Sequence, residues 1–470
     1  MNRNLSAGAA DFTDNGAWQA LLEEAPPRAE EVRTILERSR ELIPLGLSET
    51  ALLLRVRDAA LWQEVYAAAR RLKDAVYGNR IVLFAPLYIG SRCINDCAYC
   101  GFRRGNPEAE RRTLAGPELE AQVRALLRSG HKRLILVFGE HPDYDAEFIA
   151  RTVREVYSVR EGRGHIRRVN VNAAPFDVEG FRTIRQAGIG TYQVFQETYD
   201  HATYARVHPA RTSKGDFPWR LDALSRAQEA GCDDVGIGAL FGLSDWRLEV
   251  LGLVAHALFL RDRFGAGPHT ISFPRLRPAS GAASDGLAAV SDEEMRRVIA
   301  VLRLAVPYTG LILTARESGP LRRDLLALGV SQIDAGSRLE MGSYTEPVPA
   351  HRLEQAQFEL GDDRSLDEVL TELAGDGYLP SFCTACYRRG RTGEHFMELA
   401  EPGQIGRLCT PNALATLEEY LCDHASPDAR VAGERLLAAE LERMPEDGLK
   451  ATLRDRLRRI REEGERDLDF

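Results

Sequence analysis

Between residues 80 and 346, short apolar runs alternate with longer amphipathic runs, and this alternation constrains the fold more than any other feature of the chain. The short runs predict strands at Ile81–Ile89, Arg133–Phe138, Ile166–Val171, Gly190–Phe195, Asp234–Leu240, Thr270–Phe273, Gly310–Thr314 and Val330–Ala335. The longer runs predict helices, such as Trp246–Phe264, and many are closely followed by glycine, a common helix stop. Eight strand-then-helix units predict an α/β fold, a (β/α)8 TIM-type barrel. The alternative is an open doubly wound sheet, but no GxGxxG turn supports its dinucleotide-binding form.

Two regions flank the predicted barrel of residues 80–346. Residues 1–79 read as an N-terminal helical segment, rich in Glu and Arg with apolar residues at helical spacing. Residues 347–470 form a mainly helical C-terminal region, with helices expected at Leu366–Leu373, Asn412–His424 and Asp428–Glu463. Between the first two of these helices, Ser381–Gly393 is rich in Cys, Gly and Arg and is expected to be a loop.

Composition excludes several classes of protein. The net charge of −9 argues against a general nucleic-acid binder, which usually carries a basic surface. No apolar run reaches the ~18 residues of a membrane span, and the first residues lack the apolar core of a signal peptide. We therefore expect a cytoplasmic protein that binds neither nucleic acid nor a membrane.

Polar residues follow most of the predicted strands, where barrel enzymes place their active sites. They are the Cys93–Cys100 group, Gly139-Glu140, Asn170, Asn172, Gln196-Glu197, Arg275, Arg316-Glu317, Asp334 and Ser337-Arg338. A core that serves only stability does not require such residues at so many strand ends. The pattern therefore indicates an enzyme.

Three of the eight cysteines, Cys93, Cys97 and Cys100, lie within eight residues after the first predicted strand. Cysteine thiolates are the usual ligands of iron–sulfur clusters. Three thiolates leave one iron of a 4Fe–4S cube without a protein ligand, so that a substrate can bind there through amine and carboxylate groups. Structural zinc is the alternative, but it normally takes four ligands, and no fourth Cys or His lies close by.

This CxxxCxxC segment resembles that of the radical S-adenosylmethionine (SAM) superfamily. The resemblance implies that SAM chelates the open iron, with Tyr99 near its adenine. Gly139-Glu140 resembles the superfamily's GGE motif, which holds the methionine amine, although Phe138 replaces the first glycine. Glu197 is a candidate for the ribose hydroxyls, or alternatively a structural ion-pair partner.

A second cysteine set, Cys383-x2-Cys386-x22-Cys409, lies in the C-terminal region. In a barrel that already handles iron, these three thiols favour a second iron–sulfur cluster with an open corner. A zinc site is the alternative, with His395 or Cys422 as its fourth ligand. A redox pair fits less well, because such a pair normally begins a helix near a βαβ unit.

The residues around this set resemble the C-terminal region of HydG-type tyrosine lyases of FeFe-hydrogenase maturation. The matching segments are Ser381–Met397 and Cys409–Leu414, and in the barrel Cys93–Arg103, Gln193–Tyr199, Gly267–Pro278 and Ser337–Tyr344. The resemblance implies cleavage of the Cα–Cβ bond of L-tyrosine to p-cresol and dehydroglycine. It also implies that dehydroglycine yields carbon monoxide and cyanide at the auxiliary cluster, where they are assembled on an extra iron with cysteine as a ligand.

The resemblance further implies an iron ligand and partner proteins. His269 matches the position of the histidine that holds the extra iron, and it would face the barrel mouth opposite the first cluster. The expected partners are a reduced flavodoxin or ferredoxin-type electron donor and hydrogenase maturation scaffold proteins.

Tyrosine must be held by its carboxylate, and a guanidinium does so with two parallel hydrogen bonds. Arg316, after the seventh predicted strand, is our candidate, with Thr314 as a helper. The alternative role for Arg316 is a salt bridge with Glu317 at the barrel rim.

Two other functions remain open at this level. The 2-iminoacetate (dehydroglycine) synthase of thiamine biosynthesis shares the barrel and the first cluster but lacks the second cysteine set. A non-catalytic iron–sulfur scaffold would carry a cluster to an acceptor without cleaving SAM. Biotin-synthase-like sulfur insertion fits poorly, because its second cluster is ligated inside the barrel.

Overall fold

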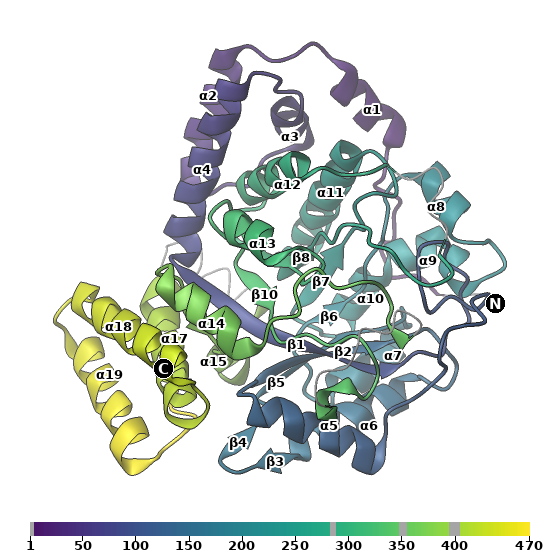
Figure 1. Ribbon diagram of the computed structural model, residues 1–470. Helices are drawn as coiled ribbons and strands as arrows, with labels where there is room; N and C mark the ends of the chain where they lie inside the picture. Colours follow the sequence, from purple (N-terminus) through teal and green to yellow (C-terminus); the bar gives the residue numbers. More distant parts are fainter. Residues whose placement is uncertain (1–3, 283–287, 347–354, 394–404) are drawn as a thin grey trace.

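The computed structural model describes residues 4–282, 288–346, 355–393 and 405–470. Its centre is a barrel of eight parallel strands (Figure 1): β1 (Arg80–Gly90), β2 (Arg133–Phe138), β5 (Arg168–Asn172), β6 (Tyr192–Gln193), β7 (Val235–Gly238), β8 (Thr270–Ser272), β9 (Gly310–Leu313) and β10 (Gln332–Asp334). The sheet closes because β10 pairs with β1, with Leu83 opposite Ile333. The predicted (β/α)8 barrel is confirmed, and each predicted strand falls on an observed one, although most observed strands are shorter.

The strands are continuously apolar because helices cover the outside of the sheet while side chains fill its inside. In β1, ten of the eleven residues are buried. The covering helices are α5 (Gly116–Arg128), α6 (Ala146–Ser158), α7 (Val178–Arg185), α8 (His201–Val207), α9 (Phe217–Leu221), α10 (Ala223–Glu229), α11 (Trp246–Phe264), α12 (Asp292–Ala305) and α13 (Gly319–Leu326). Side-chain caps set their starts: Asp145 accepts from Phe148 N in α6, and Ser291 forms a capping box with Glu294 in α12.

The N-terminal segment is helical, as predicted, and forms α1 (Asn15–Glu23), α2 (Ala29–Arg38), α3 (Leu47–Leu54) and α4 (Ala59–Tyr77). These helices lie against α11 and α12 at one side of the barrel (Figure 1). The buried stripe of α4 includes Trp62, Val65 and Leu72, at helical spacing. Because α11 is covered by both the barrel and this segment, it is apolar around most of its circumference.

A ninth parallel strand, β11 (Leu379–Ser381), was not predicted. It pairs with residues 80–82 at the start of β1, whereas β2 pairs with residues 85–90. A run of three residues is too short to show the alternating apolar pattern of a strand, so the sequence did not indicate a strand here. The strand ties the C-terminal region to the amino-terminal end of the barrel.

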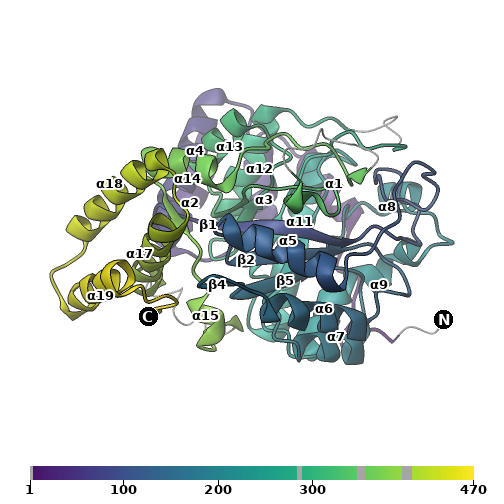
Figure 2. The ribbon, with the colours of Figure 1, turned by 60° about the horizontal axis from the view of Figure 1, so that its bottom comes forward.

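The C-terminal helices are α14 (Leu366–Gly375), α15 (Ala385–Arg388), α17 (Ile405–Asp423), α18 (Pro427–Arg443) and α19 (Gly448–Arg458), and α17–α19 form a group beside the start of β1 (Figures 1 and 2). Two predictions are corrected. The helix predicted at Asn412 begins earlier and contains Cys409, and the expected loop 381–393 contains a helical turn. Pro411 lies inside α17, although proline is disfavoured within a helix. The helices expected through 428–463 are present as α18 and α19.

The predicted division after residue 346 remains a prediction. Beyond it, residues 357–362 return to the carboxyl ends of the barrel strands, where Glu359 N donates to Pro278 O and Gly361 N donates to Ala315 O. We call residues 355–362 the strap. Among the described helices, none has both the length and the apolarity that crossing a bilayer demands.

Candidate active site

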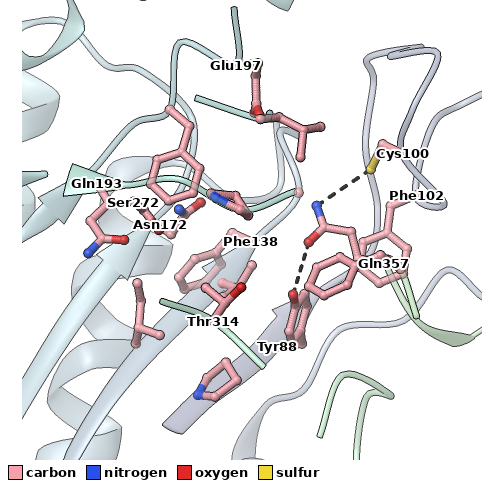
Figure 3. Close-up of a pocket in the computed structure, with 18 of the residues that line it drawn as sticks. Tyr88, Cys100, Phe102, Phe138, Asn172, Gln193, Glu197, Ser272, Thr314 and Gln357 are labelled. Atoms are coloured by element: carbon pink, nitrogen blue, oxygen red, sulfur yellow. Dashed lines mark hydrogen bonds between the residues drawn. The ribbon is translucent and has the colours of Figure 1, made fainter. Parts of the chain in front are cut away.

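A cavity opens at the carboxyl ends of the barrel strands, and it brings together all the residues predicted for the first site. Figure 3 shows part of its lining, with Cys100, Glu197 and Thr314 among the labelled residues. It is lined, among others, by Tyr88, Cys93, Cys97, Tyr99, Cys100, Glu140, Asn172, Glu197, Lys214, Arg220, Ser272, Thr314, Arg316, Gln357 and Phe358. These residues come from the ends of six strands, from the cysteine loop, from the strap and, for Lys214 and Arg220, from the segment between α8 and α10. The arrangement is the one expected of a barrel enzyme.

The loop after β1 folds so that all three of its cysteines face this cavity. Backbone hydrogen bonds fix its shape, from Cys100 N to Cys97 O (3.2 Å) and from Arg104 N to Asn95 O (2.7 Å). Burial raises the pKa of Cys97 to about 12, and the neighbouring Cys100 and Cys93 add to the shift. Burial and the neighbouring sulfurs raise the pKa values of Cys93 and Cys97, and buried thiols of this kind are suited to a cationic partner. The residues present therefore fit an iron–sulfur cluster.

Glu140 lies beside this loop and is held by it. Asn95 Nδ2 donates to Glu140 Oε2 (2.7 Å), and Ile94 N donates to the backbone oxygen of Glu140 (2.8 Å). The preceding Gly139 is required by close packing, since a Cβ there would stand 2.2 Å from Arg92 O. The Gly139-Glu140 pair thus brings a carboxylate to the rim of the cysteine loop, as the motif predicted.

Glu197 follows β6 in a left-handed conformation (φ 72°) and points into the cavity. Lys214 Nζ lies 2.7 Å from its carboxylate and Arg220 lies 3.7 Å away. Burial alone would raise the pKa of Glu197, but Lys214 and Arg220 outweigh it and hold this pKa below its usual value. Both interpretations of Glu197 are therefore compatible with the structure, because the ionised carboxylate forms an ion pair and also lines the cavity.

Tyr99 also lines the cavity, and its hydroxyl is 2.8 Å from His208 Nε2. Burial lowers the pKa of His208 to about 2, so its imidazole is neutral. The hydrogen bond fixes the hydroxyl of Tyr99, and its ring contributes an apolar part of the cavity wall.

Thr314 and Arg316 follow β9 and line the same cavity. The salt bridge considered between Arg316 and Glu317 does not form: Glu317 pairs with Arg275 and with Arg277 (3.1 Å). The guanidinium of Arg316 instead lies 3.3 Å over the ring of Phe358. Burial lowers the pKa of Arg316 to about 10, which still leaves it charged at neutral pH.

Within the described residues, the buried Thr314 hydroxyl has no hydrogen-bond partner. Buried polar groups are normally paired, so a hydroxyl and a guanidinium in one cavity indicate a ligand with an anionic oxygen group. This pair of residues fits a carboxylate such as that of an amino acid.

The second cysteine set lies at the other end of the barrel. Cys383 follows β11, Cys386 lies on α15 and Cys409 lies on α17. The Cys386 thiol donates a hydrogen bond to Cys409, which lowers the pKa of Cys409. Burial raises the pKa of Cys383 to about 11, with Cys409 adding to the shift. The three thiols therefore form one cluster in space although 26 positions separate the first from the last.

Arginines surround this second set. Arg133 Nη1 donates to Cys383 O (2.7 Å). Cys386 lowers the pKa of Cys409 most, and the positive charges of Arg80 and Arg391 lower it further. Buried positive charge stabilises thiolates, and so the donor set fits a metal cluster.

His269 lies immediately before β8, at the same end of the barrel as the second cysteines. Its Nε2 shares a hydrogen bond with the hydroxyl of Tyr387, the residue after Cys386, and its Nδ1 is 3.6 Å from Asp234. Burial lowers the pKa of His269, which keeps the imidazole neutral and able to act as a metal ligand. His269 therefore lies at the end of the barrel opposite the first cysteines, as predicted.

Of the two fourth zinc ligands considered above, Cys422 lies too far from Cys409 to share its site. Cys422 shares α17 with Cys409, and thirteen residues of helix separate their Cα atoms by about 20 Å. His395 lies outside the described residues. In the ranges that the structure covers, no three His, Cys, Asp or Glu side chains converge on one metal ion. A four-iron cube needs no such convergence, because each ligand binds a separate corner.

Several cavity residues were missed by sequence reasoning: Tyr88, Lys214, Arg220, Gln357 and Phe358. Tyr88 lies inside an apolar strand, and Lys214 and Arg220 lie in and after the loop that follows α8. Gln357 and Phe358 belong to the strap, far along the chain from every predicted strand. The order of residues gave no signal for them, because only the folded chain places them at the cavity.

Comparisons with known proteins agree with this arrangement. The radical SAM superfamily profile matches residues 87–253, and the biotin and thiamin synthesis associated domain matches residues 272–379. A crystal structure of HydG, a maturase of the FeFe-hydrogenase, is 43% identical and superposes with a TM-score of 0.94, covering 98% of this chain and 100% of that one. HydG from Carboxydothermus hydrogenoformans is 38% identical with a TM-score of 0.83, covering 95% and 98%.

2-Iminoacetate synthase from Escherichia coli (strain K12) is 32% identical over 352 residues, which are 73% of this chain and 89% of that relative. The HydG structures therefore cover more of this chain, at higher identity, than 2-iminoacetate synthase does. The superfamily match implies a 4Fe–4S cluster and SAM as cofactors. The chain belongs to the radical SAM superfamily and, within it, to the family of HydG, the FeFe-hydrogenase maturase.

Proposed function

We propose that this radical SAM enzyme is a lyase that cleaves the Cα–Cβ bond of L-tyrosine to p-cresol and dehydroglycine, and forms carbon monoxide and cyanide from the latter. The single observation that carries the proposal is the presence of two cysteine trios at opposite mouths of one barrel. A lyase that released dehydroglycine would need only the first trio. The products would serve assembly of the FeFe-hydrogenase active site, since the similar structures are those of its maturase.

At the first mouth we assign Cys93, Cys97 and Cys100 to the 4Fe–4S cluster, which when bound and reduced supplies the electron that splits SAM. Glu140 would accept the methionine amine, Tyr99 would pack against the adenine, and Glu197 would accept the ribose hydroxyls. Each of these side chains lines the same cavity as the cysteines. The ion pairs of Glu197 keep it ionised and therefore an acceptor.

Arg316 and Thr314 would bind the carboxylate of tyrosine. The ring of Phe358 supports the planar guanidinium from one side. Arg316 Nη1 donates to Arg275 O (3.4 Å), and the other N–H groups of the guanidinium would bind the carboxylate. Low dielectric around a buried guanidinium strengthens this contact.

At the second mouth, Cys383, Cys386 and Cys409 would hold the auxiliary cluster and His269 its extra iron, which when bound supplies the metal that takes up carbon monoxide, cyanide and cysteine. The support is that the three thiols interact and that Tyr387 links His269 to the residue next to Cys386. A flavodoxin or ferredoxin-type electron donor and the maturation scaffold proteins remain predictions.

The test is anaerobic reconstitution followed by incubation with dithionite, SAM and tyrosine. We expect 5′-deoxyadenosine, p-cresol and carbon monoxide, and two distinct cluster signals in the EPR spectrum of the reduced protein. Formation of p-cresol without carbon monoxide would instead assign the function of 2-iminoacetate synthase. A protein that makes no 5′-deoxyadenosine would be a scaffold, and uptake of zinc at the second set would exclude the auxiliary cluster.

A further inference from the structure

The strap places an amide group against the first cysteine set. Gln357 Nε2 lies 3.7 Å from Cys100 Sγ, and Gln357 Oε1 accepts a hydrogen bond from the Tyr88 hydroxyl at 3.0 Å (Figure 3). In the described residues, no other side-chain amide donates a hydrogen bond to one of these three sulfurs. The contact joins residues that are 257 positions apart.

Chemistry fixes the orientation of this amide. A cluster-bound thiolate only accepts hydrogen bonds, so the NH2 group must face the sulfur and the amide oxygen must face Tyr88. The phenol of Tyr88 suits that oxygen, because burial raises its pKa and keeps its proton in place. Tyr88 therefore orients Gln357 as a donor toward Cys100.

The backbone of the strap is anchored on both sides of Gln357. Gly101 N, next to Cys100, donates to Gln357 O (3.2 Å), and Glu359 N donates to Pro278 O (2.9 Å). A Cβ on Gly101 would stand 2.9 Å from Ala356 O, so glycine is needed for this close approach of the cysteine loop and the strap. The donor is thus held in place before any cofactor binds.

We propose that Gln357 is a positioning residue that tunes the first cluster by donating an N–H···S hydrogen bond to Cys100, and thereby raises the reduction potential of the cluster. The inference rests on the proposed assignment of Cys93, Cys97 and Cys100 as cluster ligands. Hydrogen bonds to cluster sulfurs are one of the levers by which proteins set these potentials. Reduction adds negative charge to the cluster, so a donor stabilises the reduced form more than the oxidised form.

The test is the midpoint potential of the first cluster, measured by EPR-monitored redox titration without tyrosine. The cluster is studied in full-length protein in which Cys386→Ala removes the auxiliary signal. Gln357→Leu removes the donor at similar size, and Gln357→Glu replaces it with an anion. We expect the potential to fall for Leu, with an about tenfold smaller equilibrium constant for reduction, equivalent to ~59 mV for one electron. It should fall further for Glu.

Glu359→Gln is the matched control, since this exposed side chain lies on the same strap but its change of charge is screened by solvent. Its potential should equal that of the parent protein. An unchanged potential in Gln357→Leu or Gln357→Glu protein with the parent iron content overturns the inference.

A second measurement does not depend on how the variants fold. Protein labelled with 15N at the glutamine side-chain amides is reduced, and hyperfine spectroscopy of its first cluster should show coupling to a 15N nucleus. Absence of that coupling also overturns the inference. If the unmutated protein formed no cluster at Cys93, Cys97 and Cys100, the proposed function itself would fail, and the two failures are thereby distinct.

Discussion

The two ends of the barrel hold three cysteines each, but they are built in different ways. At the carboxyl end, one loop of eight residues carries all three thiols, and the charged groups nearby include the carboxylates Glu140 and Glu197. At the amino end, the thiols come from a strand end, a helical turn and a long helix, and arginines surround them. One site is local in sequence, and the other exists only when the C-terminal region docks.

The two sites also differ in the segments of the chain that cover them. The strap covers the first site through Gln357 and Phe358. At the second, the last residues of the chain pair with the segment after Cys386: Arg388 with Asp467 (2.5 Å) and Arg389 with Asp469 (2.7 Å). Assembly of the second site therefore depends on the stability of tertiary contacts, whereas assembly of the first site depends mostly on its own loop.

The largest effect is expected from the first set. Cys97→Ala should abolish formation of 5′-deoxyadenosine, p-cresol and carbon monoxide together, because every product depends on cleavage of SAM. Iron content should fall by about four per chain while the second cluster remains. Product analysis and iron assay check this. Retention of p-cresol would contradict the assignment of the first site.

A substitution in the second cysteine set should affect the two products differently. Cys386→Ala should keep p-cresol formation near the level of the unmutated protein but lose carbon monoxide, because the two steps are assigned to opposite mouths. Chromatography of p-cresol and carbon monoxide trapping by haemoglobin measure both. Cys422→Ala is the control, since this cysteine lies about 20 Å along α17 from Cys409. Equal loss of both products would argue against two separate sites.

Arg316→Ala should weaken tyrosine binding by about 100-fold, the loss expected when a charge-assisted hydrogen-bonded pair worth about 3 kcal/mol is removed. SAM binding should change little. Arg316→Lys should be intermediate, because an ammonium group cannot form two parallel bonds. Equilibrium binding of each ligand provides the measurement, with Arg277→Ala as the control. Unchanged tyrosine affinity would remove Arg316 from the substrate site.

The smallest effect is expected from a substitution of Asp467. Burial tends to raise the pKa of Asp467, but Arg167 and Arg388 outweigh it and hold that pKa below its usual value. A carboxyl whose folded-state pKa is depressed stabilises the fold above its unfolded pKa, and that stability is lost as pH falls through the folded pKa. Asp467→Asn should therefore lower the free energy of opening of α17 by about 1 kcal/mol at pH 7. The difference should vanish as the pH falls through the folded-state pKa of Asp467.

Hydrogen exchange of the α17 amides at several pH values measures this local stability. Asp455→Asn is the control, because this exposed carboxylate pairs only within α19 and the segment that follows it. A pH-independent difference for Asp467→Asn would show that the ion pairs do not act as described.

Much of the fold was predictable from sequence because barrel strands are buried on both faces and read as apolar runs. Trp246–Phe264 was predicted with the bounds that α11 has. The short strand β11 was missed, because three residues are too few to show an alternating apolar pattern. Cys409 was placed outside a helix because the predicted helix began at Asn412, whereas α17 begins at Ile405. The strap gave no signal at all.

By itself, the sequence determined the barrel and the first cysteine loop, because periodicity and close spacing are local properties that the order of residues records. It also carried the second cysteine set, through short segments that resemble a known family. Only the tertiary structure decided that Gln357 reaches Cys100, that Glu317 turns to Arg275 rather than Arg316, and that Tyr387 joins His269 to the second set. These contacts link residues distant along the chain, and their partners are chosen by packing and charge after the chain has folded.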